Sequence, residues 1–291
     1  MRTLIVGSGF VGRAIADHLA GSGHPVVLSS RSPAPGTHPW RPLDVTDPGA
    51  CRALVDAVQP EAVVAVHGPS DVTWCENNSE QAAREHVAAA RNLVAAAPDR
   101  RLLLISTDNV FDGRTESFDE HAVPRPANAY GRAKLLAERH ILQAAGATVL
   151  RVSLVYGWDE HRPGQWQNFF ASCVRRLRSG SPVEAPADQW TTPVLAQDVA
   201  RVAEVVLSGG PHRLLHLGGP DRVSRSDWAR QIAASLGTAT DQVVAVPSAG
   251  TRYACRPTNS CLTSVLLDQV DPSLRIRGVA AGLRELIGSG T

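Results

Sequence analysis

The 291-residue sequence predicts an α/β fold of the doubly wound type, with a parallel sheet covered by helices on both faces and a smaller mixed α/β domain after it. Two patterns predict this fold. Short apolar runs alternate with segments of helical periodicity through the first 157 residues. These runs are continuously apolar, as expected of strands that are buried on both faces of a sheet. Hydrophobic residues make up 43% of the chain, which is enough for a sizeable core.

The predicted elements follow one another in a regular order. The apolar runs predict strands at 3–7, 25–30, 62–68, 101–107, 147–157 and 213–219. Helical periodicity predicts helices at 10–20, 48–60, 79–97, 129–146 and 196–208. Ser79 and Ser224 are placed to cap helices, and Gly146 is placed to end one. The Pro-rich tract 31–42 is expected to be a loop.

Composition excludes several classes of function. The net charge is +1 and no basic or acidic block stands out, so we expect no nucleic-acid partner. No apolar run approaches the roughly 20 residues of a membrane span. The five cysteines are odd in number and form no CxxC pair, so neither a disulfide framework nor a metal site is expected. Free thiols fit a reducing cytoplasm, and the sequence leaves a homodimer open.

The segment GSGFVG follows the first predicted strand and opens the first predicted helix. Its Gly7, Gly9 and Gly12 have the G-x-G-x-x-G spacing that binds the pyrophosphate of a dinucleotide. The first glycine allows the tight turn, the second admits the pyrophosphate, and the third lets helix and strand pack closely. Phe10 and Val11 lie at the N-terminus of the helix, which attracts the anion. A structural turn without a ligand is the alternative.

The second predicted strand ends in LSSRSP, where an NAD site usually carries an Asp or Glu for the ribose 2′-hydroxyl. Ser30 and Arg31 stand there instead. A hydroxyl and a guanidinium suit a 2′-phosphate, so we expect NADP(H) rather than NAD(H). The alternative is that Arg31 merely begins a solvated loop. Asp44 in LDVTD is the remaining acidic candidate, near the expected adenine.

Of the 29 Lys and Arg residues, only Lys134 is a lysine, and it lies four residues after Tyr130 in AYGRAK. Positions i and i+4 share a face of a helix, so the two side chains point the same way. A neighbouring ammonium lowers the pKa of a tyrosine from its usual value of about 10, which favours proton transfer. A planar guanidinium cannot simply replace that ammonium. The pair therefore predicts a proton-transferring tyrosine, although a bare Y-x-x-x-K also occurs by chance.

Ser106 and Thr107 end the predicted strand 101–107. They lie at the carboxyl edge of the sheet, where ligands of open α/β proteins bind. A hydroxyl at this position could hold a substrate carbonyl next to Tyr130. The alternative is a hydroxyl that only caps a turn.

Further segments fall in the order of one family, namely CENNSEQA, STDNVFDG, RPANAYGRAKLLAE, RVSLVYG, DQWTTP and RPTNSCL. With these, the chain resembles the extended short-chain dehydrogenase/reductases over nearly its whole length. Within them it resembles the dTDP-4-dehydrorhamnose reductases and related nucleotide-sugar ketoreductases. The resemblance implies NADPH-dependent reduction of the keto group of a nucleotide-linked 4-keto-6-deoxyhexose.

We expect a Rossmann-type cofactor domain of residues 1–157 plus 191–219 and a substrate domain of 158–190 plus 220–291, with the site in the cleft between them. The expected catalytic residues are Thr107, Tyr130 and Lys134. The expected cofactor contacts are Gly7, Gly9, Phe10, Val11, Gly12, Ser30, Arg31, Asp44, Val45, His67, Gly68, Tyr130 and Lys134. The expected substrate contacts are Thr107, Asp108, Asn168, Gln189 and Arg256.

The resemblance also implies a role for each catalytic side chain. Tyr130 would protonate the carbonyl oxygen as the hydride arrives. Thr107 would orient that oxygen, and Lys134 would tune the tyrosine and hold the nicotinamide ribose.

The chain departs from the family pattern at three places. Val6 stands where the glycine loop usually begins, HGPS (67–70) replaces an Asn-Ala-Ala run, and Asn109 replaces a tyrosine. The last change leaves the exact sugar open, and His67 is either a cofactor neighbour or, in our preferred interpretation, a buried filler. An epimerase or dehydratase is disfavoured, because dehydratases usually carry Asp-Glu where this chain has Asp108-Asn109. A non-catalytic subunit, like the regulatory subunit of methionine adenosyltransferase, is the other alternative.

Overall fold

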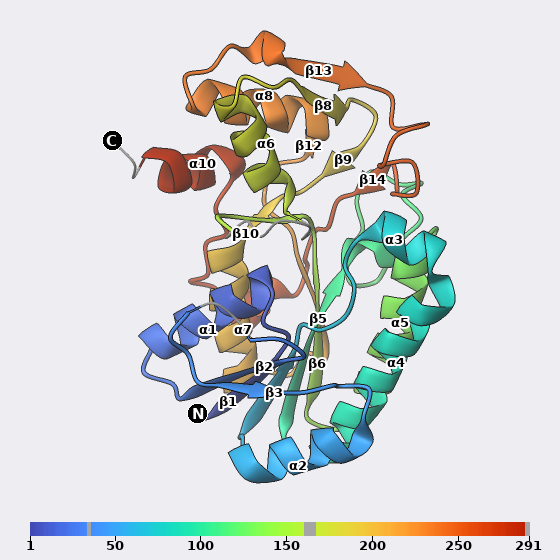
Figure 1. The fold of residues 1–291 in the computed structure, drawn as a ribbon, viewed down its shortest axis with the longest axis vertical. Helices are drawn as coiled ribbons and strands as arrows, with labels where there is room; N and C mark the ends of the chain where they lie inside the picture. The colour runs from blue at the N-terminus through green and yellow to red at the C-terminus, as the bar shows by residue number, and fades with distance from the viewer. Residues whose placement is uncertain (34–35, 160–166, 289–291) are drawn as a thin grey trace.

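The computed structural model describes residues 1–33, 36–159 and 167–288. It contains a seven-stranded parallel sheet with the order β11-β6-β5-β4-β1-β2-β3 (Figure 1). These strands are β1 (Thr3–Val6), β2 (Val26–Ser30), β3 (Trp40–Pro42), β4 (Ala62–Ala65), β5 (Arg101–Thr107), β6 (Ala147–Val152) and β11 (Leu214–Leu217). The strand order reverses at β1, which pairs with β2 on one side and with β4 on the other. The predicted doubly wound, Rossmann-type fold is therefore confirmed.

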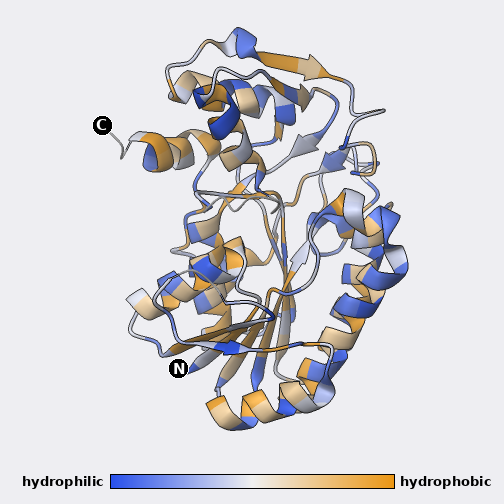
Figure 2. Ribbon diagram, viewed as in Figure 1, coloured by the Kyte–Doolittle hydropathy of each residue, from blue (hydrophilic) through white to orange (hydrophobic). Residues whose placement is uncertain are grey.

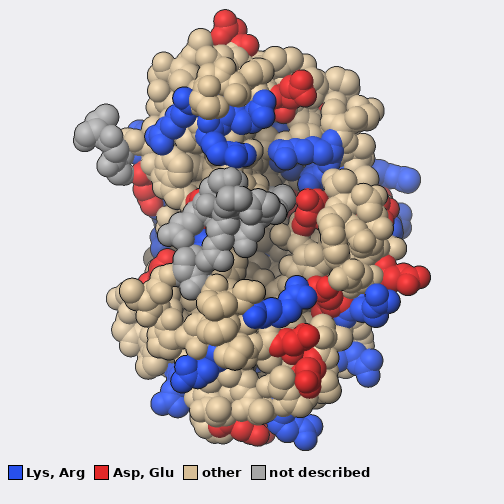
Figure 3. Space-filling model, in the orientation of Figure 1, with Lys and Arg blue, Asp and Glu red and all other residues tan. Residues whose placement is uncertain are grey.

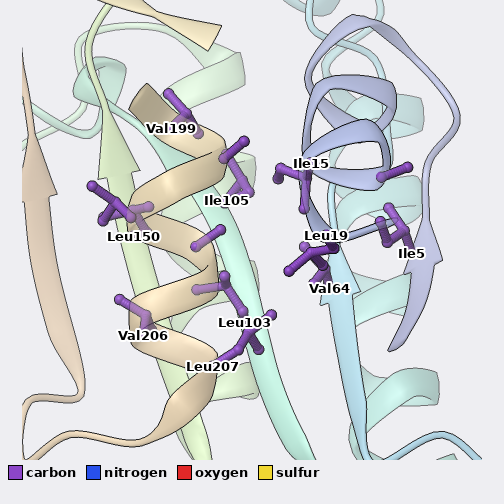
Figure 4. Packing of buried hydrophobic residues seen from close by; sticks show 14 of the residues in the cluster. Ile5, Ile15, Leu19, Val64, Leu103, Ile105, Leu150, Val199, Val206 and Leu207 are labelled. Atoms are coloured by element: carbon purple, nitrogen blue, oxygen red, sulfur yellow. The ribbon is translucent and has the colours of Figure 1, made fainter. Parts of the chain in front are cut away.

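Helices cover both faces of the sheet. One face carries α1 (Phe10–Gly21) and α7 (Ala196–Ser208), and the other carries α2 (Pro48–Val58), α4 (Ser79–Ala96) and α5 (Ala129–Ile141). Side chains alternate between the faces of a strand, so Ile5 packs with the first group and its neighbour Leu4 with the second. The inner strands are accordingly mostly apolar, whereas the edge strand β3 is hydrophilic (Figure 2). Figure 4 shows part of the first core.

A second hydrophobic core lies in the upper part of Figure 1. It joins α6 (Phe169–Arg178), α8 (Arg225–Ser235) and α10 (Val279–Ile287) around the buried ring of Trp228. Short strands complete this part, namely β8 (Val183–Pro186) with β13 (Val243–Val246), and β9 (Trp190–Thr191) with β12 (Val223–Ser224) and β14 (Asn259–Ser260). Parallel and antiparallel pairs both occur, as expected of a mixed α/β unit. The residue boundaries between the two expected domains remain a prediction.

The Pro-rich tract 31–42 is not wholly a loop, as the sequence suggested. Its last three residues form β3, which pairs in parallel with β2 in the register Leu28↔Trp40. Pro42 is tolerated because β3 is the edge strand and needs hydrogen bonds on one side only. The indole of Trp40 also donates to the Ser30 hydroxyl at 2.9 Å. No apolar run marks so short an edge strand in the sequence.

Several predicted boundaries were wrong. The strand predicted at 62–68 ends at Ala65, and Ser79 is the first residue of α4 rather than its cap. The helix α5 ends at Ile141 rather than at Gly146, because the following N–H groups of Gln143 and Ala144 bond three residues back and tighten the chain into turns. The predicted strand 147–157 is divided into β6 and β7 (Val155–Tyr156), which pairs with β10 (Val194–Leu195) outside the main sheet. The short helix α3 (Val72–Asn77), capped by Asp71, was not predicted. Among the described residues, no helix is both long and apolar enough to cross a membrane.

The central strands should dominate the stability of the fold. Leu150 on β6 is fully buried, so Leu150→Ala should lower the free energy of unfolding by about 2–5 kcal/mol through lost contacts and a residual cavity. Leu136→Ala is the matched control, because Leu136 is 41% exposed on α5 and its truncation leaves no cavity. Urea unfolding of both variants measures this difference, and equal losses would contradict the packing described here.

Candidate active site

A cavity of about 800 Å³ lies along the carboxyl edge of the sheet. Its floor is formed by the ends of β1, β2, β5 and β6 and by the residues that follow β4. Its other wall comes from the smaller part of the molecule, through Gln189, Trp190, Arg225 and Arg256. Figure 3 shows a hollow near the centre of the view, with Lys and Arg side chains gathered above it. This is the edge where parallel α/β sheets bind their ligands.

The glycine loop is shaped for a close backbone approach. Gly7 has a φ of +120°, and a Cβ there would lie 2.6 Å from the Val66 carbonyl oxygen. A Cβ on Gly12 would lie 1.9 Å from the Gly7 carbonyl oxygen, so helix and turn can meet only at a glycine. Around Gly9 a Cβ would meet nothing within 4 Å, which leaves its cavity side open. No side chain caps the N-terminus of α1, so its free N–H groups fit the pyrophosphate of a dinucleotide.

The residues expected to choose between NADP and NAD lie at the same end of the cavity. Ser30 accepts hydrogen bonds from Ser8 at 2.6 Å and from Trp40, and it donates to the Ser32 carbonyl. Arg31 is 71% exposed in its side chain and lies 3.7 Å from a Glu85 carboxylate oxygen. Hydrogen bonds from Thr46 lower the pKa of Asp44 and hold one of its oxygens. Arg31 is thus an exposed cation beside the end of β2, where it lines the cavity.

The three expected catalytic side chains line the same cavity. Thr107 ends β5, while Tyr130 and Lys134 lie on α5. The Lys134 ammonium donates to the Ile105 carbonyl oxygen at 2.7 Å, which ties α5 to β5. The close approach of α5 to the segment after β5 needs a glycine at position 131, because a Cβ there would collide with the Asn109 carbonyl oxygen. Asn128 caps α5 by accepting from the Gly131 N–H at 2.8 Å, which fixes the start of the helix.

The electrostatics differ from the expectation that Lys134 lowers the pKa of Tyr130. Burial raises the pKa of Tyr130, and the Asp108 charge adds to the rise, while a side-chain hydrogen bond with Thr107 opposes it. Burial lowers the pKa of Lys134 to about 8, and the Glu138 charge opposes that shift. In this structure the Lys134 ammonium is directed to the backbone of β5. The raised pKa of Tyr130 means that its phenol keeps its proton.

A buried polar network lies behind Lys134. Glu138 follows Lys134 by one helical turn and accepts from both Nε and Nη2 of Arg151, the latter at 2.7 Å. Ser106 also donates to Glu138, and Arg151 contacts His216 at 3.3 Å. The pair is almost completely buried, so each charge depends on the other. The network holds α5 against β5 and β6 beneath the expected catalytic residues.

Two histidines form the cavity wall next to Tyr130. His67 is buried, and neither of its ring nitrogens has a hydrogen-bond partner among the described residues. The His86 ring centroid lies 5.8 Å from that of Tyr130 and 6.1 Å from that of His67. Burial lowers the pKa of His67 to about 3, so the ring is neutral. Gly68 has a φ of +95°, and a Cβ there would collide with the His86 ring, so the ring lies against a glycine. The sequence did not single out His86.

The expected substrate contacts do not all reach the cavity. Asp108, Gln189 and Arg256 line it. Asn168 does not, because it caps α6 by accepting from the Ala171 N–H and donates to the Gly157 carbonyl at 3.0 Å. Its amide is therefore fully buried and occupied, and we withdraw it as a substrate contact.

Asp108 and Gln189 are held in place by neighbouring groups. Burial raises the pKa of Asp108, although its oxygens accept from Thr107, Asn109 and Ser153. Gln189 donates to the Tyr253 carbonyl at 2.8 Å, and its own amide oxygen is buried without a partner among the described residues.

The doubly wound sheet, the glycine loop and the arrangement of Thr107, Tyr130 and Lys134 define an NAD(P)-dependent oxidoreductase of the short-chain dehydrogenase/reductase type. The chain belongs to the family described as RmlD substrate binding domain, whose family model matches residues 1–277. Sequence relatives and solved structures are consistent with this assignment.

One relative is a dTDP-4-keto-6-deoxy-D-glucose reductase of Streptomyces niveus, 31% identical over 253 residues that cover 85% of this chain and 83% of that one. Another is the methionine adenosyltransferase 2 subunit beta of Bos taurus, 27% identical over 273 residues that cover 90% and 80%. A solved dTDP-4-dehydrorhamnose reductase from Bacillus anthracis, in complex with NADP, has a TM-score of 0.85 and covers 99% of each chain. At 21% identity, that structure supports the fold.

The buried ammonium should cost stability. Below about pH 8 Lys134 is charged in the folded and the unfolded chain, and folding bears the full cost of burying the charge. Between about pH 8 and 10.4 only the unfolded chain holds the proton, so the cost declines as the pH rises. Lys134→Met removes this cost but also the hydrogen bond to Ile105, which contributes about 1 kcal/mol. The variant should therefore raise the free energy of unfolding by about 2 kcal/mol at pH 7, and by less at pH 10.

Chemical unfolding at the two pH values measures this difference. Arg132→Met is the control, because Arg132 is an exposed cation on the same helix and its removal should give no such pH dependence. A Lys134→Met variant that is less stable than the parent at pH 7 would contradict the proposed cost.

Proposed function

We propose that the protein reduces the keto group of a nucleotide-linked 4-keto-6-deoxyhexose with NADPH, and that Tyr130 is the general acid. The observation that carries the proposal is the meeting of Thr107, Tyr130 and Lys134 in one cavity with an open glycine loop. The Streptomyces niveus relative, whose name specifies a keto-sugar reductase, supports the substrate class. The NADP complex of the Bacillus anthracis enzyme supports the cofactor.

The chain's own residues account for the binding of NADP(H). The loop from Gly7 to Gly12 and the N-terminus of α1 would hold the pyrophosphate, and Ser30 and Arg31 would hold the 2′-phosphate. Val45 and Gly68 line the cavity between them. His67 also lines the cavity, but both of its ring nitrogens are buried, which keeps our preferred interpretation of a buried filler. When bound, the cofactor supplies the hydride.

The catalytic residues would act on the carbonyl oxygen. The Thr107 hydroxyl would donate to it and fix its position at the end of β5. The Tyr130 phenol would transfer its proton to the same oxygen, because its raised pKa keeps it protonated until negative charge develops there. Lys134, buried one helical turn away, would supply positive charge and a donor for the nicotinamide ribose.

A regulatory role without turnover is the second candidate, because the chain is similar to methionine adenosyltransferase 2 subunit beta over 90% of its length. Such a subunit would bind NADP(H) without reducing a keto sugar. Turnover therefore separates the two candidates.

Removal of the phenol hydroxyl should abolish the reaction. Tyr130→Phe should lower kcat/KM for a dTDP-4-keto-6-deoxyhexose by about 10³, while NADPH affinity stays near that of the parent. Loss of NADPH absorbance measures the rate. Tyr156→Phe is the control, because the Tyr156 hydroxyl is buried without a partner among the described residues and does not line the cavity. Equal rates for the parent and Tyr130→Phe would contradict the mechanism, and NADPH binding without turnover of any keto sugar would favour the regulatory role.

Arg31 should set the cofactor preference. Arg31→Ala should raise the Kd for NADPH by about tenfold and leave the Kd for NADH unchanged, because only NADPH carries the 2′-phosphate. Fluorescence titration with both cofactors measures this change. Arg41→Ala removes an exposed arginine from the neighbouring edge strand, outside the cavity, and should change neither affinity. Equal losses for NADPH and NADH in Arg31→Ala would refute the assignment.

A further inference from the structure

A chain of hydrogen bonds runs from the start of α5 to the Thr107 hydroxyl through two asparagines. Asn128 accepts from the Gly131 N–H, and its Nδ2 donates to the side-chain oxygen of Asn109 at 2.9 Å. The amide nitrogen of Asn109 then donates to the Thr107 hydroxyl oxygen at 3.2 Å and to Asp108 Oδ1 at 2.8 Å. Asn109 lines the cavity beside Thr107. This asparagine chain, Asn128 followed by Asn109, therefore ends on the side chain that is expected to orient the substrate carbonyl.

The backbone sets the direction of the bonds in the asparagine chain. A backbone N–H can only donate, so the Gly131 N–H identifies the oxygen of the Asn128 amide. The nitrogen of that amide donates to the Cys255 carbonyl at 3.0 Å, which can only accept. The Asn109 atom that receives the Asn128 nitrogen must therefore be the amide oxygen, which leaves the Asn109 nitrogen on the side of Thr107. Neither amide can be reversed without breaking these bonds.

Asn109 fills both acceptor positions of the Thr107 hydroxyl. A hydroxyl has two lone pairs and one proton. One lone pair receives the side-chain nitrogen of Asn109 and the other receives its backbone N–H, each at 3.2 Å. The Thr107 hydroxyl can therefore only donate further, and its proton is directed to Asp108 Oδ1 at 3.1 Å in this structure. The hydrogen bond with Thr107 also opposes the rise in the pKa of Tyr130, as a donor to a phenolate does.

Asn109 also makes the Thr107 proton available to a ligand. When that proton turns to a carbonyl oxygen in the cavity, Asp108 loses one hydrogen bond. Asp108 is buried, so an unsatisfied carboxyl oxygen there would be costly. The Asn109 nitrogen still donates to Oδ1 of Asp108, and Ser153 donates to Oδ2 at 3.2 Å. The carboxyl group therefore keeps a donor on each oxygen after Thr107 has turned away.

We propose that Asn109 is a positioning residue for the reaction, because it holds the Thr107 hydroxyl as a hydrogen-bond donor for the substrate carbonyl. The proposal rests on the proposed function, which supplies that carbonyl. Asn109 then acts through Thr107 rather than by binding the substrate itself. Removal of the Asn109 amide would free a lone pair on Thr107, and the Tyr130 phenol could donate its proton there instead of to the substrate.

The first test is kinetic. Asn109→Ala should lower kcat for a dTDP-4-keto-6-deoxyhexose by about tenfold and leave KM within about twofold, because a hydrogen bond that orients the hydroxyl is lost. Asn109→Leu removes the same side-chain donor but keeps much of the volume, so it should lower kcat to a similar extent. Loss of NADPH absorbance measures the rates.

The kinetic test has a matched control. Asn77 is an exposed asparagine on α3 that does not line the cavity, so Asn77→Ala should change neither kcat nor KM. An Asn109→Leu enzyme as fast as the parent would overturn the proposal. A raised KM with unchanged kcat in Asn109→Ala would overturn it as well, because Asn109 would then be a direct substrate contact.

A double-mutant cycle decides whether Asn109 acts through Thr107. Thr107→Val removes the hydroxyl, so the addition of Asn109→Ala should slow this variant no further. A loss of about tenfold in both backgrounds would contradict the proposal, because Asn109 would then act independently of the threonine.

Urea unfolding of the four proteins in this cycle separates the proposal from the proposed function. Together, the two substitutions should lower the free energy of unfolding by less than the sum of their separate effects, because both remove the same hydrogen bond. Such less-than-additive losses in a protein that reduces no keto sugar would support the direction of the Thr107 hydroxyl and refute the reductase. Additive losses would overturn the proposal even in an active reductase.

Discussion

The hydrogen bond from the Lys134 ammonium to the Ile105 carbonyl is the contact on which the site depends. It joins the middle of α5 to the end of β5, so the helix must approach the sheet edge closely. That approach is possible because Gly131 presents no Cβ to the Asn109 carbonyl. Tyr130 then lies at the strand end that carries Thr107, and all three side chains face one cavity. A bulkier residue at position 131 would separate the phenol from the threonine.

The site is built from groups that oppose folding. Burial lowers the pKa of Lys134 and of Arg225, which means that each charged form is destabilised where it lies. The paired charges behind them behave differently, since Glu138 and Arg151 satisfy each other and also receive Ser106. The Glu138–Arg151 pair supports α5. Lys134 and Arg225, which form no ion pair within the described part of the chain, line the cavity. This division is typical of a protein that gives up stability for ligand binding.

The sequence predicted what depends on local pattern. Continuous apolar runs marked the strands, glycine spacing marked the turn before α1, and a lone lysine marked the catalytic helix. It missed what depends on tertiary pairing. The strand β3 forms because its backbone pairs with the edge of β2. Arg225 carried no signal in the sequence, since only the fold places it between the rings of Phe169 and Tyr253. The prediction that Asn168 contacts the substrate was also wrong, because an asparagine that caps a helix and one that binds a ligand look identical in sequence.

The direction of the Tyr130 pKa shift bears on the direction of the reaction. Oxidation of an alcohol needs a phenolate that can accept a proton, whereas reduction of a ketone needs a phenol that can donate one. Burial and the Asp108 charge both favour the protonated phenol, and Lys134 directs its ammonium to the backbone of β5. In the proposed reaction the phenol would therefore give up its proton only when negative charge appears on an oxygen within its reach. A carbonyl that receives hydride develops that charge, so the electrostatics of the cavity support reduction more than oxidation.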